Sequence, residues 1–128
     1  MWIYNGCSFT EDDVGDYVGF VYIIYNLTNN KKYIGKKLFT KSKTYQKKGK
    51  KKRKRVSSDW ITYTGSNTEL NQDIKNGHKI QKEILHLCVS KGWCSYHETR
   101  EILVRDCLIS NEYYNHWISC KIRRTHLT

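Results

Sequence analysis

Two tyrosines stand at the ends of a short apolar pattern in the first third of the chain, and lysines surround the second of them. Tyr22 lies in a β-branched and aromatic run, Tyr33 begins the run Tyr33-Ile34-Gly35, and the lysines nearby are Lys31, Lys32, Lys36 and Lys37. A phenol is a poor base at its ordinary pKa of about 10, but neighbouring ammonium groups favour the phenolate. We expect Lys32 to lie on the strand opposite Tyr22, where it would favour the phenolate or hold a water molecule. The tyrosines are therefore either core residues or acid–base groups.

The elements that would position these tyrosines follow from the spacing of apolar and turn-forming residues. Residues 18–37 are typical of a β-hairpin, because an apolar strand is followed by the turn formers of residues 26–30 and by a second apolar run. Residues 78–89 are apolar at several alternate positions, which favours a third strand.

Two further segments are expected to be helical. Residues 66–76 and 95–108 each begin with a serine that is followed three residues later by a glutamate, which is the spacing of a capping box. We therefore predict one small α+β domain over residues 18–128, with a three-stranded antiparallel sheet flanked by helices. Residues 1–17 are acidic and polar, and we expect them to form a loose lead-in.

The chain is strongly basic. Its 128 residues suffice for one compact domain, and 23 Lys and Arg against 12 Asp and Glu give a formal net charge of +11. A positive electrostatic field of this strength favours a polyanionic partner. Nucleic acid is favoured over an acidic membrane, because we find neither an apolar span nor a basic amphipathic helix. The first residues lack a basic and then apolar leader, so we expect the protein in the cytoplasm.

Residues 38–56 differ in character from the rest of the chain. Between Lys31 and Arg55 there are 14 basic residues and no acid. We expect a mobile, solvated loop that binds phosphate backbones in a salt-dependent and sequence-independent way. The residues expected to bind nucleic acid are Lys36, Lys37, Lys50, Lys51, Lys52, Arg53, Lys54 and Arg55.

The five cysteines are odd in number and follow no disulfide framework, so we expect reduced thiols. Four potential zinc ligands lie near one another in the sequence, namely His86, Cys88, Cys94 and His97. Their spacing matches no common zinc finger, and a structural zinc site is the weaker alternative.

The order of several motifs resembles one known family. Tyr22 is followed eleven residues later by Tyr33-Ile34-Gly35, and further along by Glu98 and Asn115. This pattern resembles the GIY-YIG endonuclease superfamily, and in particular its small phage or mobile-element members. The resemblance covers about residues 18–124. The second motif is intact, whereas Phe20-Val21-Tyr22 stands where Gly-Ile-Tyr is usual.

The resemblance implies an endonuclease that hydrolyses double-stranded DNA with Mg²⁺ or Mn²⁺. Phosphodiester hydrolysis needs a proton acceptor for water and charge that stabilises the transition state and the leaving oxygen. By resemblance, Tyr22 is the general base, Tyr33 orients phosphate or water, Glu98 holds the metal ion, and Asn115 is the family's late asparagine. The family also has a basic residue after the second motif, followed at a short interval by a histidine or tyrosine. By spacing, these two residues correspond to Lys41 and Tyr45. If the chain carries an insertion there, the basic residue corresponds to Arg55 instead, and both assignments stay open.

Other readings of the same residues remain. Glu98 is equally placed to cap a helix. The chain could also be a non-catalytic basic module that binds DNA or RNA, including a ribosome-associated one, with aromatic side chains that stack on bases. If the protein is a nuclease, cleavage of both strands with one site per chain requires a homodimer or two successive nicks. A phage-encoded protein would act in the cytoplasm of its bacterial host, and we expect a short or weak sequence preference.

Overall fold

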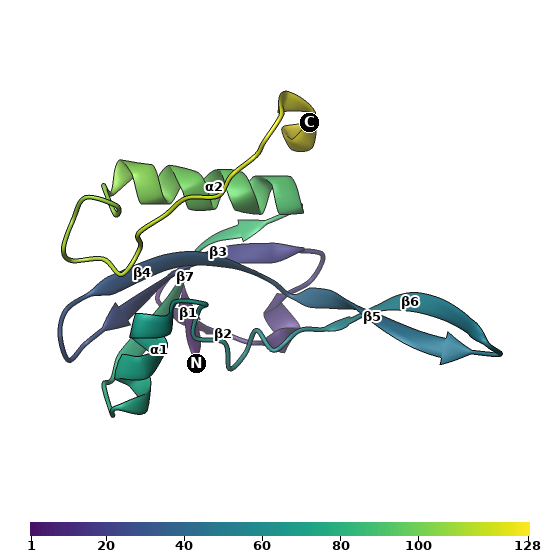
Figure 1. Ribbon diagram of the computed structural model, residues 1–128, viewed down its shortest axis with the longest axis horizontal. Helices are drawn as coiled ribbons and strands as arrows, with labels where there is room; N and C mark the ends of the chain where they lie inside the picture. The colour runs from purple at the N-terminus through teal and green to yellow at the C-terminus, as the bar shows by residue number, and fades with distance from the viewer.

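A five-stranded sheet forms the centre of the computed structural model, which describes residues 1–128 (Figure 1). The strand order is β2-β1-β7-β3-β4, with bounds Cys7–Phe9, Trp2–Tyr4, Ile80–Cys88, Gly19–Asn26 and Lys32–Leu38. β1 and β7 are parallel and the other neighbours are antiparallel. The predicted α+β class is confirmed. The predicted sheet is wrong in detail, because it has five strands and mixed directions rather than three antiparallel strands.

The N-terminal residues belong to the sheet and are not the loose lead-in that we expected. Trp2 is only 1% exposed, and its indole N–H donates a hydrogen bond to the Trp60 carbonyl at 2.7 Å. Phe9 is also buried. The acidic residues that suggested a lead-in lie on the surface, around a short 3-10 helix η1 (Glu11–Asp13). Two buried aromatic rings therefore anchor a segment whose other side chains are mostly polar.

Both α-helices begin at positions other than the predicted capping boxes. α1 spans Thr68–Lys75, and its N-cap is Asn67, which accepts a hydrogen bond from the Leu70 N–H at 2.9 Å. α2 spans Lys91–Val104, and its N-cap is Ser90. Glu98 consequently lies inside α2 rather than in its first turn, so it does not cap that helix. A final 3-10 helix, η2 (Arg124–Leu127), ends the chain. None of these helices is long and apolar enough to span a membrane.

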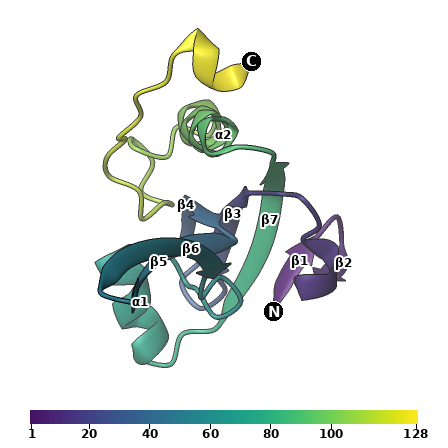
Figure 2. The ribbon, with the colours of Figure 1, turned by 90° about the vertical axis from the view of Figure 1, so that its right-hand side faces the viewer.

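The sheet is covered on both faces by different elements (Figure 2). α2 packs over one face, where Val21, Ile23, Ile34 and Ile102 form a small core together with three buried cysteines. α1 and the segment that follows β6 cover the other face, where the core is larger and aromatic. That core contains Trp2, Phe9, Phe20, Tyr22, Ile24, Phe39, Trp60, Leu70, Ile84 and Tyr114. Hydrophobic residues make up only 38% of the chain, and large aromatic rings supply much of the apolar volume of this core.

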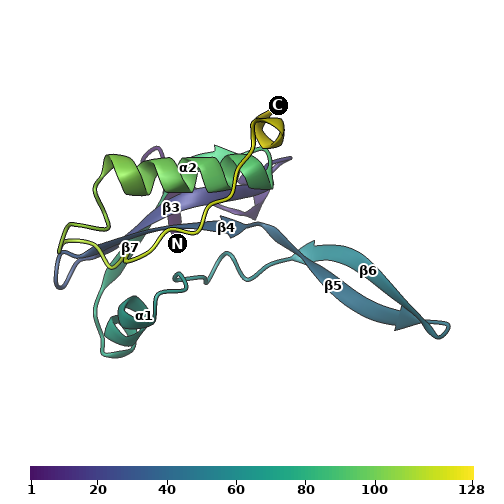
Figure 3. The same ribbon diagram turned by 45° about the horizontal axis from the view of Figure 1, so that its top comes forward.

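The basic segment is a β-ribbon, not the loop that we expected. β5 (Thr40–Lys47) and β6 (Lys50–Ser57) pair antiparallel and project away from the sheet (Figures 1 and 3). The turn residues Lys48 and Gly49 have φ of 53° and 75°, and two-residue hairpin turns with positive φ match the twist of the flanking strands. The glycine removes the strain of one of these positions. The basic segment is therefore an ordered two-stranded arm. Its sequence did not indicate strands, because it lacks alternating apolar residues.

Candidate active site

Tyr22 is held at the centre of the sheet by a contact that only glycine permits. It lies on β3 directly opposite Gly35 on β4, and it is 1% exposed. A Cβ atom built at Gly35 would overlap the Tyr22 hydroxyl and ring. The last residue of the Tyr33-Ile34-Gly35 motif therefore leaves the space that the phenol hydroxyl occupies.

The departure from the first family motif does not displace Tyr22. Phe20, at the position where glycine is usual, turns its ring into the aromatic core, with ring centroids 4.9 Å from Trp2 and 5.0 Å from Phe39. A β-bulge between β3 and β7 falls between Val21 and Tyr22. Bulges next to active sites commonly redirect a side chain, and this one precedes the tyrosine in question.

Tyr33, on the edge strand β4, lies beside Tyr22 on the same face of the sheet. The two ring centroids are 6.2 Å apart, and the Tyr33 hydroxyl is 3.3 Å from the Ser66 hydroxyl. Gly65 closes the pocket around both rings. Its φ of +85° favours glycine, and a Cβ there would lie 3.1 Å from the Tyr33 ring and 3.3 Å from the Tyr22 hydroxyl. Two glycines from distant parts of the chain thus shape the space around the tyrosines.

Glu98 reaches the tyrosines from α2, over the opposite face of β4. Burial raises the pKa of Glu98 above its ordinary value, while the ammonium and the backbone of Lys36 act in the opposite direction. The charge of Glu98 in turn contributes to the raised pKa of both Tyr22 and Tyr33. The four ion pairs of the structure do not include Glu98. Its carboxylate is therefore a half-buried acceptor whose charge is not neutralised by an ion pair.

Asn115 acts on the backbone of the Tyr33-Ile34-Gly35 motif. Its side-chain oxygen accepts a hydrogen bond from the Ile34 N–H at 3.0 Å, and its amide donates to the Ile34 carbonyl at 2.9 Å. β4 is an edge strand, so these backbone groups have no neighbouring strand on that side. Residues 112–114 pair with the same edge through the backbone of Lys32. Asn115 is thus a positioning residue that completes the edge of β4.

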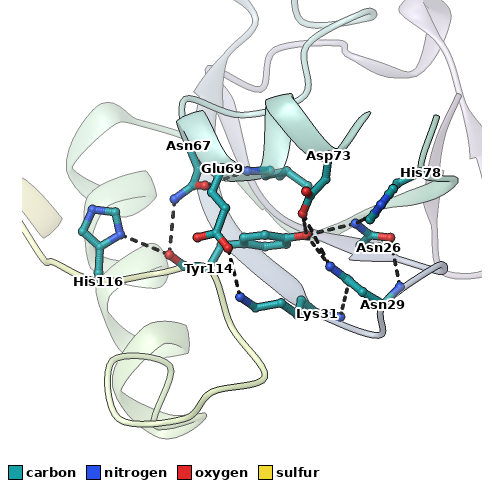
Figure 4. Close-up of polar contacts among 10 residues, drawn as sticks. Asn26, Asn29, Lys31, Asn67, Glu69, Asp73, His78, Tyr114 and His116 are labelled. Carbon is teal, nitrogen blue, oxygen red and sulfur yellow. Dashed lines mark hydrogen bonds and ion pairs between the residues drawn. The ribbon is translucent and has the colours of Figure 1, made fainter. Parts of the chain in front are cut away.

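A buried polar network fixes the residue before Asn115 (Figure 4). The Tyr114 hydroxyl donates to the Asp73 carboxylate at 2.6 Å and accepts from the Asn26 amide at 2.9 Å. Asn26 also contacts His78 Nδ1 at 2.9 Å. Asn67, the N-cap of α1, donates to the Tyr114 carbonyl at 3.2 Å. Because buried polar networks are rigid when their members are satisfied, this cluster locks the C-terminal segment against α1 and the end of β3.

The structure overturns the expected role of Lys32. In the hairpin register Lys32 lies opposite Tyr25, and its ammonium is 5.3 Å from the centre of the Tyr113 ring. It does not line the cleft around Tyr22. The pKa of Tyr22 is raised well above its ordinary value, first by burial and then by Tyr33, Tyr63 and Glu98. The expectation that a lysine favours its phenolate is therefore wrong for the free protein.

Lys36 lines the cleft with the two tyrosines, and Lys37 contacts Tyr63 beside them. The Lys36 ammonium donates to the Ser95 hydroxyl at 2.6 Å, on the α2 side of β4. The Lys37 ammonium lies 4.0 Å from the centre of the Tyr63 ring and 2.7 Å from the Asp59 carboxylate. Sequence reasoning did not find Tyr63, which contacts the Tyr22 ring edge-on at 6.2 Å. Only its aromatic character and its closeness to Gly65 in the sequence signalled it.

The remaining predicted site residues lie on the ribbon. Lys41 and Arg55 line a hollow of about 640 Å³ together with Lys36 and Ser95, so both stand near the cleft. Tyr45 lies farther along β5, opposite Lys52, and its ring faces the Lys54 ammonium at 5.6 Å. The structure thus separates Tyr45 from the cleft, and it leaves both Lys41 and Arg55 as candidates for the family's basic residue.

One cleft of about 970 Å³ gathers four of the eight predicted catalytic residues, namely Tyr22, Tyr33, Glu98 and Asn115. It is lined by Tyr22, Tyr33, Lys36, Ser66, Glu98 and Asn115, with further residues from α1 and the C-terminal segment. The cleft wraps around the edge of β4, with the tyrosines from one face of the sheet and Glu98 from the other. Residues from β3, β4, α2 and two irregular segments therefore converge on one place.

The cleft fits a magnesium ion, which commonly binds through one or two protein carboxylates together with water and substrate phosphate. Glu98 supplies one such carboxylate, without an ion-pair partner. No group of three or more histidine, cysteine, aspartate or glutamate side chains is placed to hold a metal ion. The four candidate zinc ligands therefore do not form such a group. His86 stacks on His97 at 4.4 Å and contacts Glu101 at 2.8 Å, whereas Cys88 and Cys94 are buried in the core below α2.

Comparison with protein families gives one result. A family model described as "Putative endonuclease segE, GIY-YIG domain" matches residues 2–118. No curated protein and no solved structure matches the chain significantly. The matched residues include both tyrosine motifs, the ribbon, Glu98 and Asn115. The chain belongs to the SegE-type family of GIY-YIG endonuclease domains.

Proposed function

We propose that this protein is a divalent-metal-dependent endonuclease that hydrolyses phosphodiester bonds in double-stranded DNA. The observation that carries the proposal is the convergence of Tyr22, Tyr33 and Glu98 on one cleft at the edge of β4. A basic surface adjoins this cleft, in keeping with the net charge of +11. Family membership supports the reaction class, and the cleft supplies residue types that suit it.

In the proposed mechanism, the phenolate of Tyr22 takes the proton of the attacking water at its oxygen. Burial first, and then Tyr33, Tyr63 and Glu98, raise the pKa of Tyr22, so the free protein holds the neutral phenol, which must first lose its own proton to solvent. Neutralising the charge of Glu98 would favour that loss, because Glu98 contributes to the raised pKa of Tyr22. Glu98 would hold Mg²⁺ or Mn²⁺, which supplies Lewis-acid charge for the phosphate and the leaving oxygen.

The other cleft residues bind and orient. The Tyr33 hydroxyl, beside Ser66, can donate a hydrogen bond to a phosphate oxygen or to water. Lys36 brings a positive charge to the α2 side of the cleft, next to Glu98. Asn115 holds the backbone of Ile34 and thereby fixes the position of Tyr33 and Gly35. A cut in both strands requires either two chains or two successive nicks.

A second candidate function is a nucleic-acid-binding module without catalysis. The burial of Tyr22 favours it, because a tyrosine that is 1% exposed in an aromatic core is also an ordinary structural residue. Such a module would bind DNA through the ribbon and leave it intact. The two functions predict different results for the wild-type protein in one assay.

Nicking of supercoiled plasmid separates the two functions. With Mg²⁺ the protein should convert the plasmid to open-circle or linear forms, and excess EDTA should stop the reaction. Tyr22→Phe should reduce the rate by about 10²- to 10⁴-fold, the usual contribution of a general acid or base. Tyr25→Phe is the matched control, because Tyr25 lies on the same strand but packs against the opposite core. Full activity in Tyr22→Phe would remove the tyrosine mechanism, and an inactive wild-type protein would support the binding module.

A further inference from the structure

The β5–β6 ribbon has two chemically different faces. Successive side chains of a strand alternate between faces, and directly paired residues of two strands share a face. The register Ser42↔Arg55, Thr44↔Arg53 and Gln46↔Lys51 therefore defines one face, and Lys43↔Lys54, Tyr45↔Lys52 and Lys47↔Lys50 define the other. We call them the arginine face (Thr40, Ser42, Thr44, Gln46, Lys51, Arg53, Arg55, Ser57) and the lysine face (Lys41, Lys43, Tyr45, Lys47, Lys50, Lys52, Lys54, Val56).

Side-chain contacts agree with this division. The guanidinium of Arg55 donates to the Thr40 hydroxyl at 2.8 Å and to the Ser42 hydroxyl at 3.3 Å, all three on the arginine face. The Lys54 ammonium lies over the Tyr45 ring, and both residues belong to the lysine face. Residues 41–55 are exposed throughout, so both faces are open to a partner.

The two faces suit different parts of a DNA duplex. Lysine is a flexible point charge that binds phosphate without regard to sequence, whereas arginine and glutamine can bind base edges through two hydrogen bonds at once. Serine and threonine also contact base edges. Charge alone does not require both arginines, the glutamine and the small hydroxyl residues to share one side. Their segregation suits contact with base edges on that side and with phosphates on the other.

The base of the ribbon leads to the cleft, mainly through the arginine face. Thr40, Ser42 and Arg55 of that face, with Lys41 of the lysine face, line the hollow of about 640 Å³ that also contains Lys36. Lys36 lines the catalytic cleft as well. A duplex that lies against the arginine face would therefore continue over the residues proposed to cut it.

The dimensions of the ribbon match a DNA groove. Strands of eight residues extend over about 26 Å at roughly 3.3 Å per residue, and the major groove, about 12 Å wide, admits a two-stranded ribbon. We propose that the arginine face enters the major groove beside the scissile bond and reads base edges, while the long lysine side chains of the other face extend past the edges of the ribbon to the phosphates that border the groove. This proposal rests on the proposed function for the identity of the partner as double-stranded DNA. It replaces the expected sequence-independent loop with a reading arm.

Two matched variants test the assignment of the faces. Arg53→Gln with Arg55→Gln alters the arginine face, and Lys52→Gln with Lys54→Gln alters the lysine face. Both pairs remove two positive charges from interleaved positions of β6. The measurement is the selection and sequencing of bound duplexes from a randomised DNA pool, in EDTA so that no cleavage is needed. The wild-type protein should prefer particular bases at one or two positions by about 5- to 150-fold each, as bidentate contacts do.

The arginine-face variant should lose that preference, and the lysine-face variant should retain it while binding all sequences more weakly. Equal selectivity in both variants, or a wild-type protein without preference, would overturn the proposal. Because binding is measured without cleavage, a failed nuclease assay would not mimic either result. Replacing Arg55 also removes its hydrogen bonds to Thr40 and Ser42. Arg53→Gln alone is therefore a second variant, in which these hydrogen bonds within the ribbon remain. Thermal melting of each variant verifies the fold.

Discussion

The cleft and the ribbon use their polar residues under opposite physical conditions. In the cleft, Tyr22 is 1% exposed, and burial is the first cause of the raised pKa of Tyr22, Tyr33 and Glu98. On the ribbon, residues 41–55 are exposed, and ten of them are basic. Charges act strongly at short range in a dry site, whereas exposed charges act at longer range and are screened by salt. Changes in the cleft should therefore alter rate, and changes on the ribbon should alter salt-dependent binding.

The largest effect is expected from Glu98→Gln. Glutamine keeps the shape of the side chain but is a poor ligand for a hard cation, so cleavage with Mg²⁺ should fall below detection while DNA binding remains. Mg²⁺ should also raise the melting temperature of the wild-type protein and not that of Glu98→Gln, which tests the metal site without an activity assay. Normal cleavage by the variant would exclude Glu98 as the metal ligand.

The pH dependence of stability gives Glu98 a matched control on the same helix. Because folding raises the pKa of Glu98, its ionised form destabilises the fold above the ordinary carboxyl pKa of 4.5. Glu98→Gln should therefore raise the melting temperature at pH 7, and the gain should vanish below pH 4.5. At Glu101, burial is outweighed by hydrogen bonds from Arg105 and His86, which lower its pKa. Glu101→Gln should lower the melting temperature at pH 7 and leave the metal-dependent rate near that of the wild type. Shifts of the same sign in both variants would contradict this assignment.

Gly35→Ala should have the next largest effect on rate. The added methyl group would overlap the Tyr22 hydroxyl, so the phenol must move. A displacement of about 1 Å at a catalytic group can cost about 10²-fold in rate. Single-turnover cleavage at saturating DNA measures the loss. Gly49→Ala is the control, because no atom lies within 4 Å of a Cβ built at Gly49. Its positive φ would strain the turn, but the cleavage rate at saturation should change little.

The sequence predicted the parts of the site that depend on local pattern. The hairpin and the intact Tyr33-Ile34-Gly35 motif placed Tyr22 beside Tyr33, because both lie on paired neighbouring strands. The same hairpin misplaced Lys32, since its position depends on the register. Lys32 pairs with Tyr25, three residues from Tyr22, and it lies on the face of β4 that Tyr33 and Gly35 do not share.

The rest of the structure depends on long-range contacts that leave weak local signals. Trp2 joins a three-residue strand that pairs in parallel with β7, about 80 residues away. Tyr63 and Gly65 reach the site from a segment without regular secondary structure. The ribbon lacks apolar alternation altogether, so only the Lys48-Gly49 turn marked it as a hairpin. The capping-box pattern mispredicted the start of α2, because Ser95 lies about one turn inside the helix. The N-cap is Ser90, whose backbone is extended.

A smaller effect on turnover, with a clear effect on binding, is expected for the lysine face. Replacing Lys43, Lys50, Lys52 and Lys54 with Gln should reduce the slope of log affinity against log salt by about 0.9 for each phosphate that the variant no longer neutralises. The cleavage rate at saturating DNA should change much less than in Gly35→Ala. If turnover at saturation collapses while the salt slope stays constant, the ribbon takes part in the chemistry and the division between cleft and ribbon is wrong.

The smallest effect is expected from reducing agent. All five cysteines are free thiols, and Cys88 and Cys94 are the buried pair that contact each other between β7 and α2. A disulfide across such a short loop would contribute about 2 kcal/mol, which shifts the melting temperature of a domain of this size by several degrees. Because the thiols are expected to stay reduced, dithiothreitol should leave the melting temperature unchanged. A fall of several degrees that Cys94→Ser abolishes would show that a disulfide forms and ties α2, with Glu98, to the sheet.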